Sequence, residues 1–342
     1  MPTNIVYSDD TKPGITRKKM RQGWGYWDAQ GDRITDRAEI DRLNAIGLPP
    51  AYGNAWFCPK ANGHIQAVGW DDRGRKQYRY HAGFREAQEA AKYERCADFG
   101  LALPKLRKAV ESDLRKRSLS RERAVAAVIR LLDGGHIRVG NEAYAEANES
   151  FGATTLRKRH GAVKGATLKL QYKGKSGKPR TLKITDRSLS SFVKKCQDLD
   201  EQHLFAWLDD AGEAHPVTST DVNCYIRAAT GTEFTAKNFR TWAASVAAFE
   251  ALASAEADLS LKAMLEPVVA RLGNTAAIAR KSYVHPSLIA LVKQGQSTFR
   301  KALRLPRAKR YLSREECGLI AFLEAGTPAT APVITTARAK AA

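Results

Sequence analysis

The sequence predicts an α+β protein in which a small, β-rich N-terminal domain precedes a larger, mostly α-helical domain. Short aromatic segments separated by turn residues fill residues 1–82. Helical periodicity dominates residues 83–300. Within that helical region, residues 167–184 alternate apolar and polar side chains about a glycine-rich turn, which predicts a β-hairpin.

Composition indicates the number of domains and the class of partner. The chain has 342 residues, of which 43% are hydrophobic, and this is enough apolar material for two packed domains. Its 56 Lys and Arg against 36 Asp and Glu give a formal net charge of +20. A protein this basic usually neutralises a polyanion, and nucleic acid is the first candidate. An anionic membrane is the rival, but the sequence has no apolar run long enough to span a bilayer and no basic amphipathic helix with a bulky apolar face.

The cysteines and histidines predict neither a metal site nor disulfides. The five cysteines are odd in number and form no C-x-x-C pair, so free buried thiols in a reducing cytoplasm are favoured. The seven histidines form no H-E-x-x-H spacing. Residues 1–14 are polar and carry no visible signal peptide. We therefore expect a cytoplasmic protein with no cofactor and no metal.

The N-terminal domain is expected to be a small, mostly β module. Turn-rich stretches at residues 28–32, 61–64 and 71–74 separate its elements. Pro49 and Pro50 follow the one helical segment and end it. The strands are expected at residues 24–27, 55–58 and 64–70, and the helix at residues 36–45.

The informative part of this module is residues 74–81, in which basic side chains alternate with tyrosines at strand spacing. A solvated edge strand protected by Lys and Arg has the same pattern. A DNA-contacting strand is favoured by the global charge, with basic side chains on phosphates and the others at groove edges. The residues expected to contact DNA are Arg75, Lys76, Gln77, Tyr78 and Tyr80.

The larger domain, residues 83–300, is expected to be built mainly from helices. Pro104 is expected to start one helix, Ser120 to cap another, and Thr220 or Asp221 to cap a third. Thr275 is expected to cap a short helix that precedes Pro286. The longer helices are expected at residues 84–98, 105–116, 120–134, 188–197, 221–229, 243–255 and 259–272.

Two hairpins and a C-terminal extension complete the prediction. The first hairpin has a lysine-rich tip at residues 174–179, and a shorter one is expected at residues 205–217. Residues 301–342 form a basic extension. Ser313 and Glu316 have the spacing of a capping box for a last helix. Residues 327–342 are rich in Ala, Thr and Pro and are expected to be disordered.

Four separated residues have the chemistry for attack on a phosphodiester. Tyr283 can supply an oxygen nucleophile. Arg138 and Arg240 can neutralise the non-bridging oxygens, and Lys175 can protonate the departing sugar oxygen. Lys237 has the K-x-x-R spacing that places it on one helix face with Arg240. Each residue alone has an ordinary explanation, since single arginines are usually solvated and a tyrosine near a turn usually packs.

The order of these segments and the sequences around them resemble those of a type IB DNA topoisomerase of the small, poxvirus-like bacterial form. The matching pieces together span roughly residues 15–290, and the set in this order is specific although no single piece is. They are Gly-Arg-Lys-Gln-Tyr-Arg-Tyr (74–80), Ile-Arg-Val-Gly-Asn-Glu (137–142), Tyr-Lys-Gly-Lys (172–175), Thr-Ala-Lys-Asn-Phe-Arg-Thr-Trp (235–242), Leu-Gly-Asn-Thr (272–275) and Lys-Ser-Tyr (281–283).

The resemblance implies a transient single-strand break through a 3′-phosphotyrosine, followed by strand rotation and religation without ATP or metal. Tyr283 would be the nucleophile, Arg138 and Arg240 would clamp the scissile phosphate, and Lys175 would be the general acid. Lys237 would support the site or adjacent phosphates. We also expect Tyr144 to contact DNA.

One position departs from the best-known pattern of that family. Asn274 stands where the viral and nuclear enzymes carry a histidine. Its amide can donate a hydrogen bond to a non-bridging oxygen but cannot carry charge or shuttle protons. His136 and His285, which lie near Arg138 and Tyr283, are expected to be structural. Among the lysines near the hairpin tip, Lys175 is preferred as the general acid because the matching family motif is aromatic-x-Gly-Lys.

The resemblance implies a monomer that encloses double-stranded DNA as a C-shaped clamp. A tyrosine recombinase or integrase is the nearest alternative, because it uses almost the same residues. Its second arginine normally lies in H-x-x-R, whereas this chain has Lys237-Asn-Phe-Arg240. A non-enzymatic architectural DNA-binding protein would explain the charge but not the ordered set of Arg, Lys, Arg and Tyr.

Overall fold

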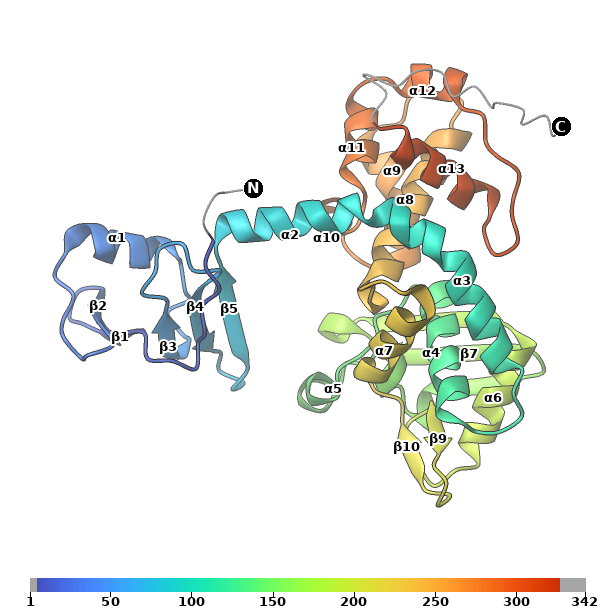
Figure 1. The fold of residues 1–342 in the computed structure, drawn as a ribbon, viewed down its shortest axis with the longest axis horizontal. Helices are drawn as coiled ribbons and strands as arrows, with labels where there is room; N and C mark the ends of the chain where they lie inside the picture. Colours follow the sequence, from blue (N-terminus) through green and yellow to red (C-terminus); the bar gives the residue numbers. More distant parts are fainter. Residues whose placement is uncertain (1–4, 327–342) are drawn as a thin grey trace. The chain divides into compact units, whose positions relative to one another are not determined.

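The chain divides into two compact units, one ending at Glu94 and the other beginning at Arg95. The computed structural model describes residues 5–326, and its course is drawn in Figure 1. The disorder predicted for residues 327–342 lies outside the described residues. The predicted α+β class is confirmed, because an antiparallel sheet dominates the first unit and helices dominate the second.

The first unit is a five-stranded antiparallel sheet with the order β2-β1-β3-β4-β5. Its core is made by apolar side chains from the sheet and from one helix, including Tyr26, Leu43 and Phe57. The predicted strands are present, and one further strand, β1, was not predicted. The elements are β1 (Ile15–Lys19), β2 (Trp24–Trp27), α1 (Arg37–Ala45), β3 (Gly53–Phe57), β4 (Ile65–Trp70), β5 (Lys76–Tyr80) and α2 (Ala82–Glu94).

Local chemistry explains where these elements begin and end. The Asp36 side chain accepts a hydrogen bond from the Glu39 amide and so caps α1, which covers most of the predicted helix at residues 36–45. Strand β5 lies at the edge of the sheet, paired with β4 alone.

Helix α2 groups with the first unit, so this unit extends beyond residue 82, where the sequence places the domain boundary.

The second unit is built around two buried helices, α4 and α8. All but one of residues 123–132 of α4 are buried, and α8 is buried from Phe239 to Phe249. The helices are α3 (Cys96–Leu114), α4 (Arg121–Gly135), α5 (Glu142–Asn148), α6 (Arg187–Gln197), α7 (Ser219–Thr230), α8 (Ala236–Ser254), α9 (Leu261–Leu272), α10 (Ala276–Ser282), α11 (Pro286–Lys293), α12 (Gln296–Ala302) and α13 (Arg314–Glu324).

Two predictions about helix ends are wrong. Pro104 does not start a helix but lies inside α3. The missing hydrogen bond there is outweighed by packing, since Phe99, Leu103 and Leu106 of the same helix are buried. Helix α7 is capped by Thr218 rather than by Thr220 or Asp221, because Thr218 and Asp221 form a reciprocal capping box.

The predicted hairpin is the larger part of a three-stranded sheet with the order β6-β7-β8. Leu168, Leu170 and Tyr172 point into the core, and the alternate residues Lys169, Gln171 and Lys173 point outward. The second predicted hairpin is also present. The elements are β6 (Gly161–Lys164), β7 (Thr167–Lys173), β8 (Pro179–Thr185), β9 (Ala206–Leu208) and β10 (Ala214–Pro216), with single 3₁₀ turns η1 (Ala153–Thr155), η2 (Lys158–His160) and η3 (Lys175–Gly177).

Helix α13 belongs to the core of the second unit. Ser313 and Glu316 form the predicted capping box. Arg107 of α3 bonds Glu316 of α13 at 2.8 Å and Asp133 of α4 at 2.7 Å. Trp242 of α8 donates a hydrogen bond to Glu316 at 3.0 Å. One buried ion network therefore ties four helices together, including both helices that lead to the candidate site.

Replacing Glu316 with Gln should lower the free energy of unfolding by about 3–5 kcal/mol, because it leaves the buried Arg107 charge undercompensated. The matched control is Glu233→Gln, which breaks an exposed pair with Arg227 and should change that free energy by less than about 1 kcal/mol. Urea unfolding of the full chain, followed by far-ultraviolet circular dichroism, measures both. Equal effects of the two substitutions would contradict a structural role for this network.

In the part of the chain that the structure describes, no helix combines the length and apolar character needed to cross a bilayer.

Candidate active site

The end of helix α4 positions Arg138. The helix finishes with His136 in the left-handed conformation, at φ 52°, and the chain then turns toward the buried Ile137. The His136 carbonyl accepts a hydrogen bond from Nη1 of Arg240. Burial, together with the positive charges of Arg271, Arg240 and Arg107, lowers the pKa of the His136 imidazole to about 4. The ring is therefore neutral near pH 7, in keeping with its predicted structural role.

Arg240 lies in the first turns of α8 and is 4% exposed. Its Nη2 donates to the Leu272 carbonyl at 3.3 Å and to Oδ1 of Asn274 at 3.2 Å. Burial and the neighbouring positive charge of Arg138 lower the pKa of Arg240. Among residues 5–326, Arg240 forms no ion pair with a carboxylate. Neutral oxygens of His136, Leu272 and Asn274 hold its guanidinium, which keeps its capacity to bind an anion.

Asn274 links the two arginines. It follows Gly273, which ends α9 in the left-handed conformation at φ 65°. Its Oδ1 accepts from Arg138 at 2.8 Å and from Arg240 at 3.2 Å. Its Nδ2 is buried and has no hydrogen-bond partner among the described residues. The amide therefore orients both guanidiniums and retains one N–H donor group.

Tyr283 lies directly after α10, the helix that Thr275 caps as predicted. Its backbone carbonyl accepts a hydrogen bond from the Ser245 hydroxyl at 3.4 Å, and the Arg240 Cζ lies 5.0 Å from the centre of its ring. Burial opposes ionisation of the phenol, but the charges of Arg240, Arg138 and Lys237 and a hydrogen bond with Arg240 outweigh burial. The pKa of Tyr283 is consequently lowered from its ordinary value.

Arg138, Arg240 and Tyr283 meet at one cleft of about 370 Å³, whereas the buried Asn274 lies behind the arginines and is not part of its lining. Its lining contains four cationic side chains and no carboxylate, so its electrostatics favour an anion. The predicted residues that line it are Arg138, Tyr144, Lys175, Lys237, Arg240 and Tyr283. The cleft therefore brings together a tyrosine oxygen and positive charges that can surround a phosphate.

The two lysines near the hairpin tip differ in their surroundings. Lys175 lines the cleft. Lys173 points away from the buried face of β7 and forms an exposed ion pair with Glu149 at 3.1 Å. This difference favours Lys175 as the lysine that reaches a group bound in the cleft.

Comparison with known proteins identifies the family. The profile described as the eukaryotic DNA topoisomerase I catalytic core matches residues 81–301, more than half of the chain. The chain belongs to the type IB DNA topoisomerase family. The profile described as the bacterial DNA topoisomerase IB N-terminal domain matches residues 23–71 of this topoisomerase.

Two topoisomerases similar in sequence agree with this assignment. The DNA topoisomerase 1B of Acanthamoeba polyphaga mimivirus is 30% identical over 300 residues, which are 84% of this chain and 89% of the viral protein. The DNA topoisomerase 1 of Mycosarcoma maydis is 25% identical over 201 residues, 52% of this chain and 19% of that protein. A solved structure of the XerH site-specific recombinase, bound to its difH substrate after cleavage, is 18% identical with a TM-score of 0.36, over 54% of this chain and 47% of the other.

The DNA-contacting residues predicted in the first unit of the topoisomerase lie on edge strand β5, except Arg75, which directly precedes it. Tyr78 and Tyr80 are 40% and 42% exposed, and their rings stack with centroids 5.9 Å apart. Arg75 and Gln77 both bond the Asp71 carboxylate, at 2.7 and 3.1 Å, and Lys76 pairs with Asp10. Tyr78 and Tyr80 are thus exposed on this strand, while Arg75, Lys76 and Gln77 are engaged with carboxylates of the same unit.

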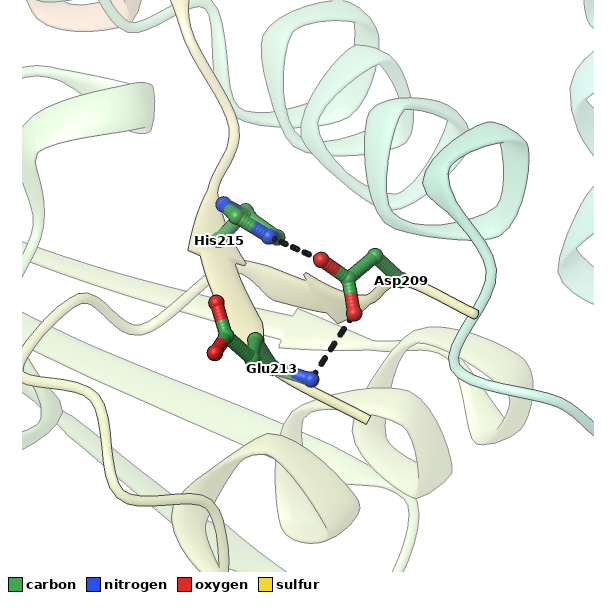
Figure 2. A group of neighbouring side chains, drawn as sticks. All are labelled: Asp209, Glu213 and His215. Atoms are coloured by element: carbon green, nitrogen blue, oxygen red, sulfur yellow. Dashed lines mark hydrogen bonds and ion pairs between the residues drawn. The ribbon is translucent and has the colours of Figure 1, made fainter. Parts of the chain in front are cut away.

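A second polar cluster in the topoisomerase lies on the β9–β10 hairpin and has the residue types of a metal site. Figure 2 shows its members, Asp209, Glu213 and His215. Asp209 accepts hydrogen bonds from two backbone amides of the turn, at 2.9 and 3.0 Å, and its other oxygen lies 2.7 Å from His215 Nε2. These contacts close the turn, and the cluster gives no independent sign of a metal.

The sequence did not predict two residues that shape the cleft at Tyr283. Ser245 fixes the backbone on both sides of Val284, because it donates to the Tyr283 carbonyl and accepts from the His285 amide at 3.1 Å. The sequence feature that could have indicated Ser245 is its position as a single hydroxyl residue within an apolar stretch of α8. Asn141 lines the cleft and caps α5 by accepting from the Tyr144 amide.

The lowered pKa of Tyr283 can be measured directly. Tyrosinate absorbance of the wild type minus that of Tyr283→Phe should titrate at a lower pH than an ordinary tyrosine, which has a pKa of about 10. Arg138→Gln should raise this pKa, because it removes a positive charge that stabilises the phenolate. A transition at or above the ordinary pH, or one that Arg138→Gln leaves in place, would contradict the assignment of these charges.

Proposed function

We propose that this topoisomerase relaxes supercoiled DNA by transient cleavage of one strand, with Tyr283 as its nucleophile. The observation that carries the proposal is the contact of Tyr283 with Arg240, which shares the amide of Asn274 with Arg138 at a cationic cleft. Family membership supports the reaction class, and the cleft chemistry supports the assignment of roles.

In the cleavage step, the Tyr283 oxygen attacks the scissile phosphorus and a new P–O bond forms. The bond from phosphorus to the 5′ oxygen breaks, and that oxygen leaves as a hydroxyl after accepting a proton. The 3′ phosphate remains as a phosphotyrosine diester. The lowered pKa of Tyr283 increases the fraction of phenolate near neutral pH, and this makes the attack easier.

Arg138 and Arg240 are assigned to the non-bridging oxygens, where negative charge increases in the transition state. Asn274 orients both guanidiniums and offers its remaining N–H to the same phosphate. Loss of one preorganised donor of this kind costs about 3–4 kcal/mol of transition-state stabilisation. Lys237 adds positive charge at the same cleft.

Lys175 is assigned as the general acid. It lines the cleft from the hairpin tip, and its ammonium group can give a proton to the departing 5′ oxygen. In the reverse step, the neutral amine takes the proton back as the 5′ hydroxyl attacks the phosphotyrosine. The diester conserves the energy of the phosphodiester bond, so rotation and religation need no ATP.

We further propose that the two units bind one duplex as a C-shaped clamp and that a single chain is sufficient. The exposed Tyr78 and Tyr80 support DNA contact by β5, and Tyr144 at the cleft supports contact near the scissile phosphate. Double-stranded DNA as the substrate implies a cytoplasmic, nucleoid-associated location.

The proposal predicts relaxation of both positively and negatively supercoiled plasmid with EDTA present and without ATP. Tyr283→Phe should abolish relaxation, because it removes the attacking oxygen. Gel electrophoresis of the products measures this. Absence of relaxation by the wild type would overturn the proposal, and strand exchange between paired sites would indicate a recombinase.

The two hairpin lysines give a second test. Lys175→Ala should slow strand cleavage by about 10²–10⁴-fold, the usual contribution of a general acid. Lys173→Ala is the matched control and should cleave at nearly the wild-type rate, because its side chain is paired with Glu149 at the surface. Single-turnover cleavage of a labelled oligonucleotide measures both variants. The reverse order of effects would reassign the general acid to Lys173.

A further inference from the structure

Arg180 is a third arginine near this cleft, and the roles proposed above do not use it. It lies at the start of β8, directly opposite Tyr172 of β7. Directly opposite residues in an antiparallel pair point to the same face, and Tyr172 is 8% exposed on the buried face. The Arg180 side chain is therefore directed into the second unit, whereas the neighbouring Lys183 is exposed on the outer face.

The side chain of Arg180 spans two glycines that flank proposed site residues. Its Cγ packs over Gly174, where an added Cβ would lie 3.2 Å away. Its Nη1 packs directly on Gly273, where an added Cβ would lie only 1.7 Å away. Gly174 precedes Lys175, and Gly273 precedes Asn274. Arg180 thus connects the hairpin tip to the turn that holds both other arginines.

The charge of Arg180 is also unusual for a half-buried side chain. Across residues 5–326 it forms no ion pair, and it hydrogen-bonds the side chain of Tyr172. Its positive charge acts on Arg240, whose pKa it helps to lower. An uncompensated guanidinium beside other guanidiniums is electrostatically unfavourable, so the packing of Arg180 on Gly174 and Gly273 and its hydrogen bond with Tyr172 must hold it there.

We propose that Arg180 is a positioning residue that fixes the hairpin tip against the turn at Gly273 and thereby holds Lys175 at the leaving oxygen. The lysine stem is long and exposed, so the geometry of proton transfer depends on where the tip is held. This inference rests on the proposed function of Lys175 as general acid.

The test compares two leaving groups at the scissile phosphate. One oligonucleotide carries the normal 5′ oxygen, and the other carries a bridging 5′ sulfur. A thiol has a pKa of about 8.5, far below that of an alcohol, so a thiolate departs without a proton donor. Arg180→Ala should cleave the oxygen substrate about 10–100-fold more slowly than the wild type. It should cleave the sulfur substrate at close to the wild-type rate.

Three control variants calibrate the comparison. Lys175→Ala should show the same rescue by sulfur, because it lacks the proton donor itself. Asn274→Ala should stay slow on both substrates, because it loses contacts that position the groups around the phosphate. Lys183→Ala removes a positive charge from the same strand on the outer face and should be normal on both.

The outcomes distinguish this inference from the function on which it rests. Wild-type rates of Arg180→Ala on the oxygen substrate would overturn the inference. Slow cleavage by Arg180→Ala of both substrates would also overturn it, because Arg180 would then act on the phosphate or on the fold. If Arg180→Ala does not fold, Arg180→Lys gives the same comparison with the charge retained. Failure of the wild type on both substrates would instead overturn the proposed function.

Discussion

The site depends on one buried guanidinium held by neutral oxygens. Arg240 of α8 donates to the carbonyl at the end of α4, to the carbonyl at the end of α9 and to the Asn274 side chain. A buried charge with no carboxylate partner is costly unless oxygen dipoles surround it. The chain supplies these dipoles by ending α4 and α9 with residues in the left-handed conformation, which turns their last carbonyls toward α8. This single constraint therefore brings three distant segments to one point.

The other elements of the second unit can be understood as support for that arrangement. The ion network of Arg107, Asp133 and Glu316 fixes α4 and α8 from the side of α3 and α13. Ser245 fixes the backbone of the tyrosine segment to α8. The β7–β8 hairpin contributes Lys175 to the lining of the cleft. Each support acts on backbone position, so the charged groups at the cleft need no carboxylate to hold them, and their charge remains available to a phosphate.

The sequence predicted which residues meet at the cleft better than it predicted the residues that support them. Arg138, Lys175, Arg240 and Tyr283 were predicted because their order and surrounding motifs match a family pattern. The hairpin and most helices were predicted because their periodicity is strong. Pro104 was misplaced because packing of Phe99 and Leu103 overrides a local rule. Strand β1 pairs with β2, which follows it closely, but it was missed because its sequence, Ile-Thr-Arg-Lys-Lys, is mostly basic and lacks an aromatic or apolar alternation. Arg180 shares the inner face of β8 with Leu182 and Ile184, but its contact with Gly273 was missed because that residue is distant in sequence.

Asn274 illustrates why the departure from the family pattern is compatible with the chemistry. Its carbonyl oxygen accepts from both arginines at once, while its amide nitrogen stays free to donate. A protonated imidazole could donate to a phosphate but could not also accept from a guanidinium. Compared with a protonated histidine, the Asn274 amide lacks a positive charge but accepts hydrogen bonds from both arginines. Its hydrogen-bonding capacity does not change with pH. In the proposed mechanism, guanidiniums neutralise the transition-state charge, and the neutral Asn274 between them orients both.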